Sequence, residues 1–155
     1  MLEEYFSQCP EETRAIGRRL ADRLEPGAVL ALHGDLGAGK TCLVQGLAEG
    51  LGSDAPVCSP TFTLVQIYPG RLTLNHIDLY RVHDELEAWN LGLDEYLFGD
   101  GVTAIEWPER AADLLPPGTW IVQLAALPGA ETTRRITIQR GAPHKAGQEG
   151  KPDER

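Results

Sequence analysis

The alternation of apolar and polar positions predicts helices and strands in turn along the first half of the chain. Apolar side chains recur at helical spacing through Glu11–Leu24, and a short apolar run at Ala28–His33 is typical of a buried strand. A second helical pattern covers Lys40–Leu51, whose leucines share one face. Strands that alternate with helices favour an α/β fold, here with a mixed, mostly parallel sheet flanked by helices.

The second half of the chain adds strands and one interrupted helix. Residues 52–60 are rich in Gly, Ser and Pro and predict a loop. Thr61–Tyr68 and Leu72–Tyr80 predict the two strands of a hairpin, and a helical pattern over Asp84–Leu97 is broken near Gly92. Three further strands are expected, at Val102–Trp107, Trp120–Leu127 and Arg134–Arg140.

The composition is that of an ordinary globular domain. The 155 residues are 42% hydrophobic and 24% charged, without an apolar run long enough for a membrane span and without a leader pattern. Three cysteines, an odd number without metal-binding spacing, favour a reduced, cytoplasmic protein. Because Gly141–Arg155 lacks large apolar side chains, we expect one domain over residues 1–140 and a disordered tail.

The charge balance bears on possible partners. Lys plus Arg total 14 against 23 for Asp plus Glu, which gives a net charge of -9. Neutralisation of phosphates by basic side chains supplies most of the non-specific affinity of proteins for nucleic acid. The chain is therefore a poor candidate for binding nucleic acid by itself.

Residues 34–41 read GDLGAGKT and fit the phosphate-binding loop G-x-x-x-x-G-K-[ST] without a mismatch. The glycines let backbone amides turn toward a polyphosphate, and the helix that follows adds its positive end. Lys40 is expected to reach the β- and γ-phosphates, and the Thr41 hydroxyl to bind Mg²⁺. This pattern predicts a P-loop NTPase fold whose nucleotide contacts are Asp35, Leu36, Gly37, Ala38, Gly39, Lys40, Thr41 and Cys42.

A phosphate-binding loop needs a carboxylate near the metal, usually at the end of a neighbouring strand. Asp78 comes directly after the run Leu72–Ile77, and Glu106 directly after Val102–Ile105. Each is therefore expected near the carboxyl end of a strand, where ligand sites of α/β proteins lie. With Lys40, these two acids are the candidate catalytic residues. Thr61 lies in a connection that often senses the γ-phosphate, although an ordinary loop explains it equally well. His76 is either a core histidine or a catalytic group.

Four blocks of sequence together resemble one family. These are GDLGAGKT at 34–41, SPTF at 59–62, HIDLYR at 76–81 and EWPER at 106–110. In this order and at these separations they are similar to the blocks of the TsaE (YjeE) family. Its members are small bacterial ATPases that take part in threonylcarbamoyladenosine modification of tRNA at position 37. The resemblance covers roughly residues 5–140.

The resemblance implies a P-loop fold, ATP as the nucleotide, and Mg²⁺ held through Thr41 and Glu106, with Asp78 in the same acidic cluster. It also implies that residues near the first helix and the last strands close the nucleotide site, and Thr13 and Arg134 match those places. Cys42 departs from the family pattern, since many relatives carry a second Thr there.

The resemblance further implies two partner proteins, TsaB and TsaD, with tRNA contacted only through their complex. TsaD would carry the transfer chemistry, while ATP lets the complex turn over repeatedly. Other readings of the residues stay open. A nucleotide-gated interaction module needs no turnover, and a small-molecule kinase shares the loop but usually adds an Arg-rich lid. A GTPase should show N-K-x-D, which this sequence lacks.

Overall fold

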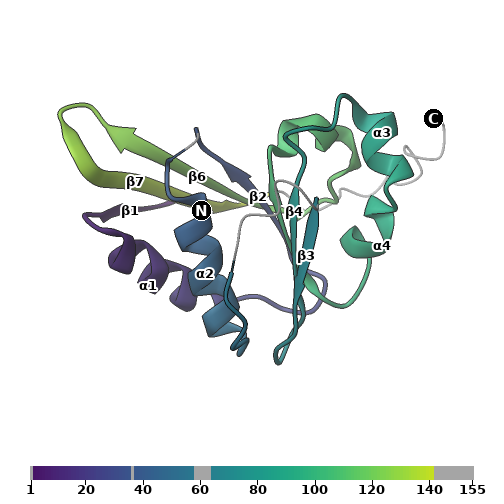
Figure 1. The fold of residues 1–155 in the computed structure, drawn as a ribbon, viewed down its shortest axis with the longest axis horizontal. Coiled ribbons are helices and arrows are strands. Elements are labelled where there is room, and N and C mark those ends of the chain that lie inside the picture. Colours follow the sequence, from purple (N-terminus) through teal and green to yellow (C-terminus); the bar gives the residue numbers. More distant parts are fainter. Residues whose placement is uncertain (1, 36, 58–63, 142–155) are drawn as a thin grey trace.

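The computed structural model describes residues 2–35, 37–57 and 64–141, and its strands form one mixed sheet in the order β1-β7-β6-β2-β5-β4-β3 (Figure 1). The central strands β6, β2, β5 and β4 run parallel to one another, and antiparallel pairings add the strands at both edges. The expected α/β class with a mixed sheet is confirmed. The strands are β1 (Glu3–Ser7), β2 (Val29–His33), β3 (Val65–Tyr68), β4 (Leu74–Asp78), β5 (Val102–Glu106), β6 (Trp120–Leu127) and β7 (Ala130–Arg140).

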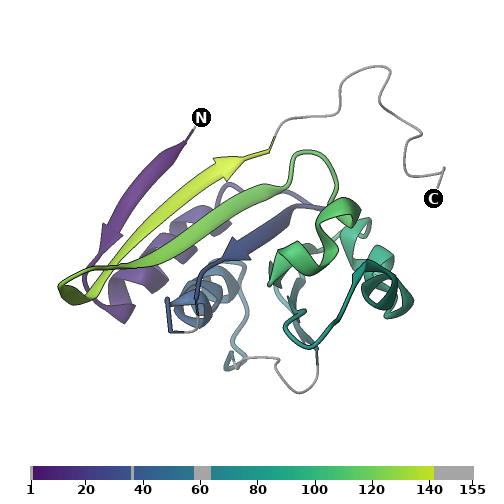
Figure 2. The ribbon, with the colours of Figure 1, turned by 90° about the horizontal axis from the view of Figure 1, so that it is seen from above.

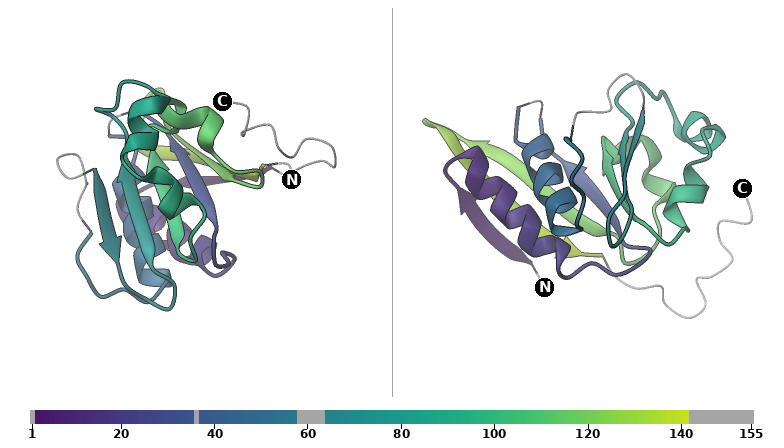
Figure 3. Two further views of the ribbon diagram at one scale, coloured as in Figure 1. Left: turned by 90° about the vertical axis from the view of Figure 1, so that its right-hand side faces the viewer. Right: turned by 60° about the horizontal axis from the view of Figure 1, so that its bottom comes forward.

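Helices cover the two faces of the sheet unequally. Helices α1 (Pro10–Ala21) and α2 (Lys40–Gly50) pack on one face, where they share the larger apolar core (Figure 3, right). The other face is covered over β5 and β4 by α3 (Glu85–Asn90), α4 (Leu93–Leu97) and the 3₁₀ helix η1 (Pro108–Leu114). Figure 2 shows no described helix in front of β1, β7 and β6 on that side. No helix among the described residues is long and apolar enough to cross a membrane.

Several of the expected elements are confirmed, with shifted ends. The predicted hairpin is present as the antiparallel pair β3 and β4. The helical pattern over 84–97 does break at Gly92, which has φ 81° and directly precedes α4. Strand β4 ends at Asp78, so the strand predicted to run to Tyr80 was too long. The reason is local: the Tyr80 amide donates to the Asp78 carboxylate, which turns the chain.

Strand β1 was not predicted, because its five residues EEYFS carry little apolar signal. It forms because β7 offers a long partner strand, with Tyr5 opposite Ile136 in the register. The carboxylate of Glu3 accepts two hydrogen bonds from the terminal guanidinium nitrogens of Arg23, at 2.8 and 2.7 Å. That contact, followed by the hydrogen bond from Tyr5, lowers the pKa of Glu3 to about 2.

Glycines let α1 and α2 approach to backbone contact. A Cβ placed on Gly46 would lie 2.1 Å from the Arg14 carbonyl oxygen, and one on Gly17 would lie 2.4 Å from that of Leu43. Neither helix has room for a side chain there. On the sheet side of α2, the side chains of Leu43 and Leu47 are fully buried. The packing of α1 against α2 thus fixes the position of the helix that starts at the predicted phosphate loop.

The substitution Gly46→Ala should destabilise the protein by roughly 1–3 kcal/mol, because α1 must move away from α2. An alanine in a helix interior otherwise stabilises by about 0.5–1 kcal/mol relative to glycine. Urea unfolding measures the change, with Arg19→Ala at an exposed position of α1 as the control. A stabilised Gly46→Ala variant would show that the two helices do not pack this closely.

The pair of Glu3 and Arg23 should make stability depend on pH. Folding lowers the pKa of Glu3 from its ordinary value of 4.5. The pair of Glu3 and Arg23 therefore stabilises the folded state fully at pH values above 4.5. That stabilisation is lost as the pH falls through about 2. We expect Glu3→Gln to lower the free energy of unfolding by about 1 kcal/mol at pH 7, and by less toward pH 2. Denaturant unfolding at several pH values measures this. Exposed Glu25→Gln is the control, and a pH-independent difference for Glu3→Gln would contradict the assignment.

Candidate functional site

The loop between β2 and α2 has the strand-loop-helix context expected of a phosphate-binding loop. Gly37 and Gly39 have φ values of 81° and 103°, in the region that a side chain disfavours. Gly39 precedes the first turn of α2, and no described side chain caps that turn and no acidic residue lies in it. The amides and the positive helix end are therefore available to an anion.

Lys40 points into the site from the start of α2. Its side chain is 5% exposed, and the ammonium donates to the Gly34 carbonyl oxygen at 2.7 Å. The same nitrogen lies 3.8 Å from a Glu106 carboxylate oxygen and 4.7 Å from the centre of the Trp107 ring. The lysine charge is thus held by the Gly34 carbonyl of the loop and by Glu106, the last residue of β5.

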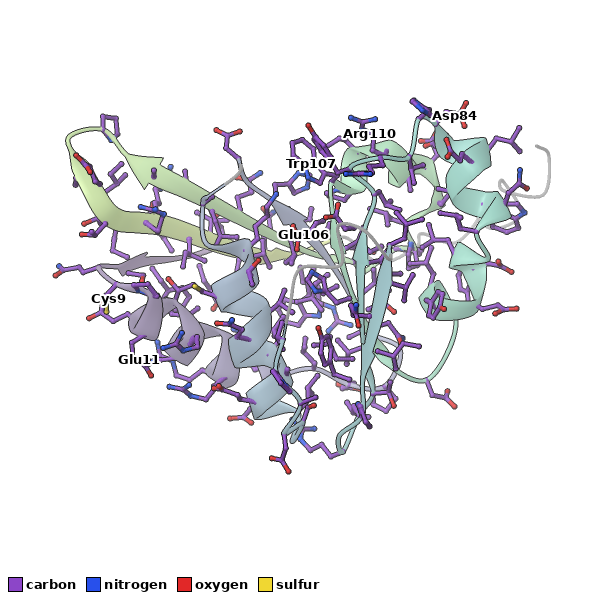
Figure 4. The ribbon with its side chains drawn as sticks, viewed as in Figure 1. Cys9, Glu11, Asp84, Glu106, Trp107 and Arg110 are labelled. Carbon is purple, nitrogen blue, oxygen red and sulfur yellow. The ribbon has the colours of Figure 1, made fainter. Side chains whose placement is uncertain are left out.

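Asp78 and Glu106 end neighbouring parallel strands and lie opposite each other in the register of β4 and β5. Both are buried, at 4% and 5% exposure. Figure 4 shows Glu106 and Trp107 near the centre of the molecule, at the end of the sheet where α2 begins. Carboxylate and hydroxyl oxygens suit Mg²⁺, which nucleotide sites usually bind through one or two carboxylates together with phosphate oxygens. The two carboxylates have the chemistry that such an ion prefers, and Thr41 follows Lys40 in the first turn of α2.

His76 is a buried residue of β4 that contacts Glu106. Its side chain is fully buried, and its Nε2 lies 2.6 Å from the second carboxylate oxygen of Glu106. Its Nδ1 has no hydrogen-bond partner among the described residues. The sequence left open whether His76 is a core or a catalytic residue, and the structure shows that it contacts an acid of the site.

Thr13 and Arg134 both lie beside the loop. The Arg134 guanidinium, from β7, donates to the Gly37 carbonyl oxygen at 3.1 Å. The Thr13 methyl group lies 3.9 Å from the point that a Cβ on Gly39 would occupy. The buried Thr13 hydroxyl forms a hydrogen bond of 2.7 Å with the Ser7 hydroxyl. The two residues come from opposite ends of the chain, and the antiparallel pairing of β1 with β7 brings them together.

The other residues expected to contact the nucleotide differ in their exposure to solvent. Asp35 is exposed, Ala38 is buried, and Thr41 and Cys42 are half-buried at the start of α2. Leu36, Thr61 and the tail residues 142–155 lie outside the described residues. Sequence reasoning missed the contact of His76 with Glu106, and the resemblance pointed to Arg134 but not to its partner Gly37. Both contacts join residues far apart in the chain. Alternation along β4 could have indicated the first, since it places His76 and Asp78 on one face.

The packing of the Trp107 ring is a further feature of the site. This residue follows Glu106 directly and adopts a left-handed backbone conformation, with φ 59°. Its ring packs on that of Tyr80, with the ring centres 5.0 Å apart, as well as over the Lys40 ammonium. A bulky residue in this conformation is strained, and such strain often lies at functional sites.

Comparison with known proteins identifies the family. The family model for the threonylcarbamoyl adenosine biosynthesis protein TsaE matches residues 7–136. A tRNA threonylcarbamoyladenosine biosynthesis protein TsaE from Bacillus subtilis is 52% identical over 130 residues, which are 83% of this chain and 80% of that protein. The protein of the same name from Treponema pallidum is 44% identical over 132 residues, which cover 85% and 96% of the two chains.

A solved structure shows the same fold. The crystal structure of Bacillus subtilis YdiB matches with a TM-score of 0.77 and 36% sequence identity, over 92% of this chain and 86% of that one. Sequence blocks, site geometry and fold therefore agree, and this chain belongs to the TsaE family of threonylcarbamoyl adenosine biosynthesis proteins.

Proposed function

We propose that this chain is a Mg²⁺-dependent ATPase that acts in threonylcarbamoyladenosine modification of adenosine 37, in tRNAs that read codons beginning with A. In this role it works in the cytoplasm with TsaB and TsaD, and ATP hydrolysis lets that pair turn over repeatedly. TsaD carries the transfer itself. The name of the family states a role in threonylcarbamoyl adenosine biosynthesis. ATP hydrolysis and the two partner proteins are what we add in this proposal.

One observation carries the proposal. Lys40 at the start of α2 lies 3.8 Å from Glu106, and Glu106 lies opposite Asp78 at the ends of two parallel strands. This arrangement supports the proposal, because it brings a lysine and two carboxylates to one edge of the sheet. Phosphoryl transfer requires mainly such positioning and charge stabilisation.

Each residue then has a defined task. The amides of residues 36–41 and Lys40 bind the β- and γ-phosphates, and Thr41, Glu106 and Asp78 provide oxygens for a magnesium ion or its waters. A bound Mg²⁺ would neutralise the charge that develops on the phosphates. Asp78 or Glu106 orients the attacking water. The net charge of -9 agrees with a subunit that meets tRNA only through its protein partners.

The deciding experiment is steady-state ATP hydrolysis by the purified protein, alone and then with TsaB, TsaD and tRNA. We expect slow hydrolysis alone and faster hydrolysis with the partners. Lys40→Ala and Glu106→Gln should each reduce the rate by about a hundredfold or more, because a charge that stabilises the transition state or its metal is lost.

Glu109→Gln is the matched control, since Glu109 is exposed three residues beyond Glu106. A Lys40→Ala variant that hydrolyses ATP normally would refute the ATPase. ATP binding without turnover in any mixture would instead favour an interaction module that the nucleotide gates. Phosphate transfer to a small molecule would favour a kinase.

Arg134 tests how the site closes on the nucleotide. Its guanidinium lies against the Gly37 carbonyl, so we expect it to contact the phosphates that the loop binds. Arg134→Ala should weaken ATP binding about ten- to a hundredfold, because a charged hydrogen bond is worth roughly 1.5–3 kcal/mol. Isothermal titration calorimetry measures the dissociation constant.

Arg135→Ala provides the control on the same strand. Arg135 follows Arg134 directly, points to the opposite face of the sheet and pairs with Glu4. The two variants remove the same charge from adjacent positions. Equal losses of ATP affinity in both would mean that net charge, and not a contact at the loop, explains the effect.

A further inference from the structure

We infer that His76 is a positioning residue, which holds the Glu106 carboxylate in the orientation that binds the metal of the nucleotide site. The inference rests on the proposed function, in which Glu106 is a metal ligand. His76 itself touches neither nucleotide nor metal.

The two oxygens of Glu106 are held from different sides. Oε1 lies 3.8 Å from the Lys40 ammonium, and Oε2 lies 2.6 Å from the His76 imidazole. The second contact is short enough for a strong hydrogen bond to a carboxylate. His76 comes from the middle of β4 and Glu106 from the end of β5, so two adjacent strands of the sheet fix this contact.

Nucleotide binding changes only one of these contacts. Lys40 is expected to turn to the phosphates, which removes its attraction for Oε1. The His76 contact does not involve the phosphate loop and can persist. A carboxylate held at one oxygen presents the other in a fixed direction, and hydrogen bonds of this kind commonly orient metal ligands.

A role in packing alone does not explain this histidine. Its side chain is fully buried, yet Nδ1 has no hydrogen-bond partner among the described residues. Burying an unpaired polar atom costs free energy, and an apolar side chain of similar shape would avoid that cost. The contact that offsets the cost is the one with Glu106.

The test compares two substitutions of similar volume. His76→Gln keeps a donor that can reach Oε2, whereas His76→Phe fills the space without a donor. For each protein, calorimetry measures the dissociation constant of ATP with excess Mg²⁺ and with EDTA. The ratio of the two constants reports the gain in affinity that the metal supplies, and it requires no turnover.

We expect His76→Phe to reduce this gain roughly tenfold or more, with little change in ATP binding in EDTA. His76→Gln should retain most of it. Asn75→Ala is the control, because Asn75 is the preceding residue on β4, is also buried, and pairs with Thr103 instead. Thermal unfolding verifies that each variant is folded.

Three results would overturn the inference. These are a normal gain in His76→Phe, an equal loss in His76→Phe and His76→Gln, and a wild-type protein whose ATP affinity does not respond to Mg²⁺. A wild-type protein that shows the gain but never hydrolyses ATP would refute the proposed ATPase and leave the role of His76 intact.

Discussion

A buried carboxylate held between a lysine and a histidine is the interaction on which the site depends. Removing charged groups from water costs several kcal/mol each, so Glu106 is tolerated only with good partners. Lys40 and His76 supply them from two different elements, α2 and β4. The position of Lys40 depends in turn on α2, which packs on α1 through Gly17 and Gly46 without intervening side chains. A movement of that helix pair would therefore change the distance between Lys40 and the Glu106 carboxylate.

Much of this arrangement could be predicted from the sequence, since local patterns encode it. The loop GDLGAGKT specifies its own backbone, because its glycines permit the positive φ values seen at Gly37 and Gly39. Asp78 and Glu106 each end an apolar run, and parallel strands bring their carboxyl ends to one edge of the sheet. The break at Gly92 and the hairpin before Asp78 follow from turn residues in the same way.

What could not be predicted depends on long-range pairing. Strand β1 has too few apolar residues to be recognised alone and is stabilised by its partner β7. The contact of Arg134 with Gly37 spans 97 residues, and that of His76 with Glu106 spans 30. Alternation places His76 on the same face of β4 as Asp78, but only the strand order shows that Glu106 lies beside them. The end of β4 at Asp78 was missed for another reason, namely that the carboxylate accepts a hydrogen bond from the Tyr80 amide and turns the chain.

The strand order also places acidic side chains on one side of β2 and a basic side chain on the other. On one side, β5 and β4 bring the acids Glu106 and Asp78, which suit a cation. On the other side, β6 and β7 lead to Arg134, which suits an anion. The loop after β2 lies between them, with two carboxylates on one side and a guanidinium on the other. Arg134 of β7 contacts the Gly37 carbonyl oxygen, and Ser7 of β1 bonds to Thr13. The antiparallel strands thus contribute contacts beside the loop as well as extending the sheet.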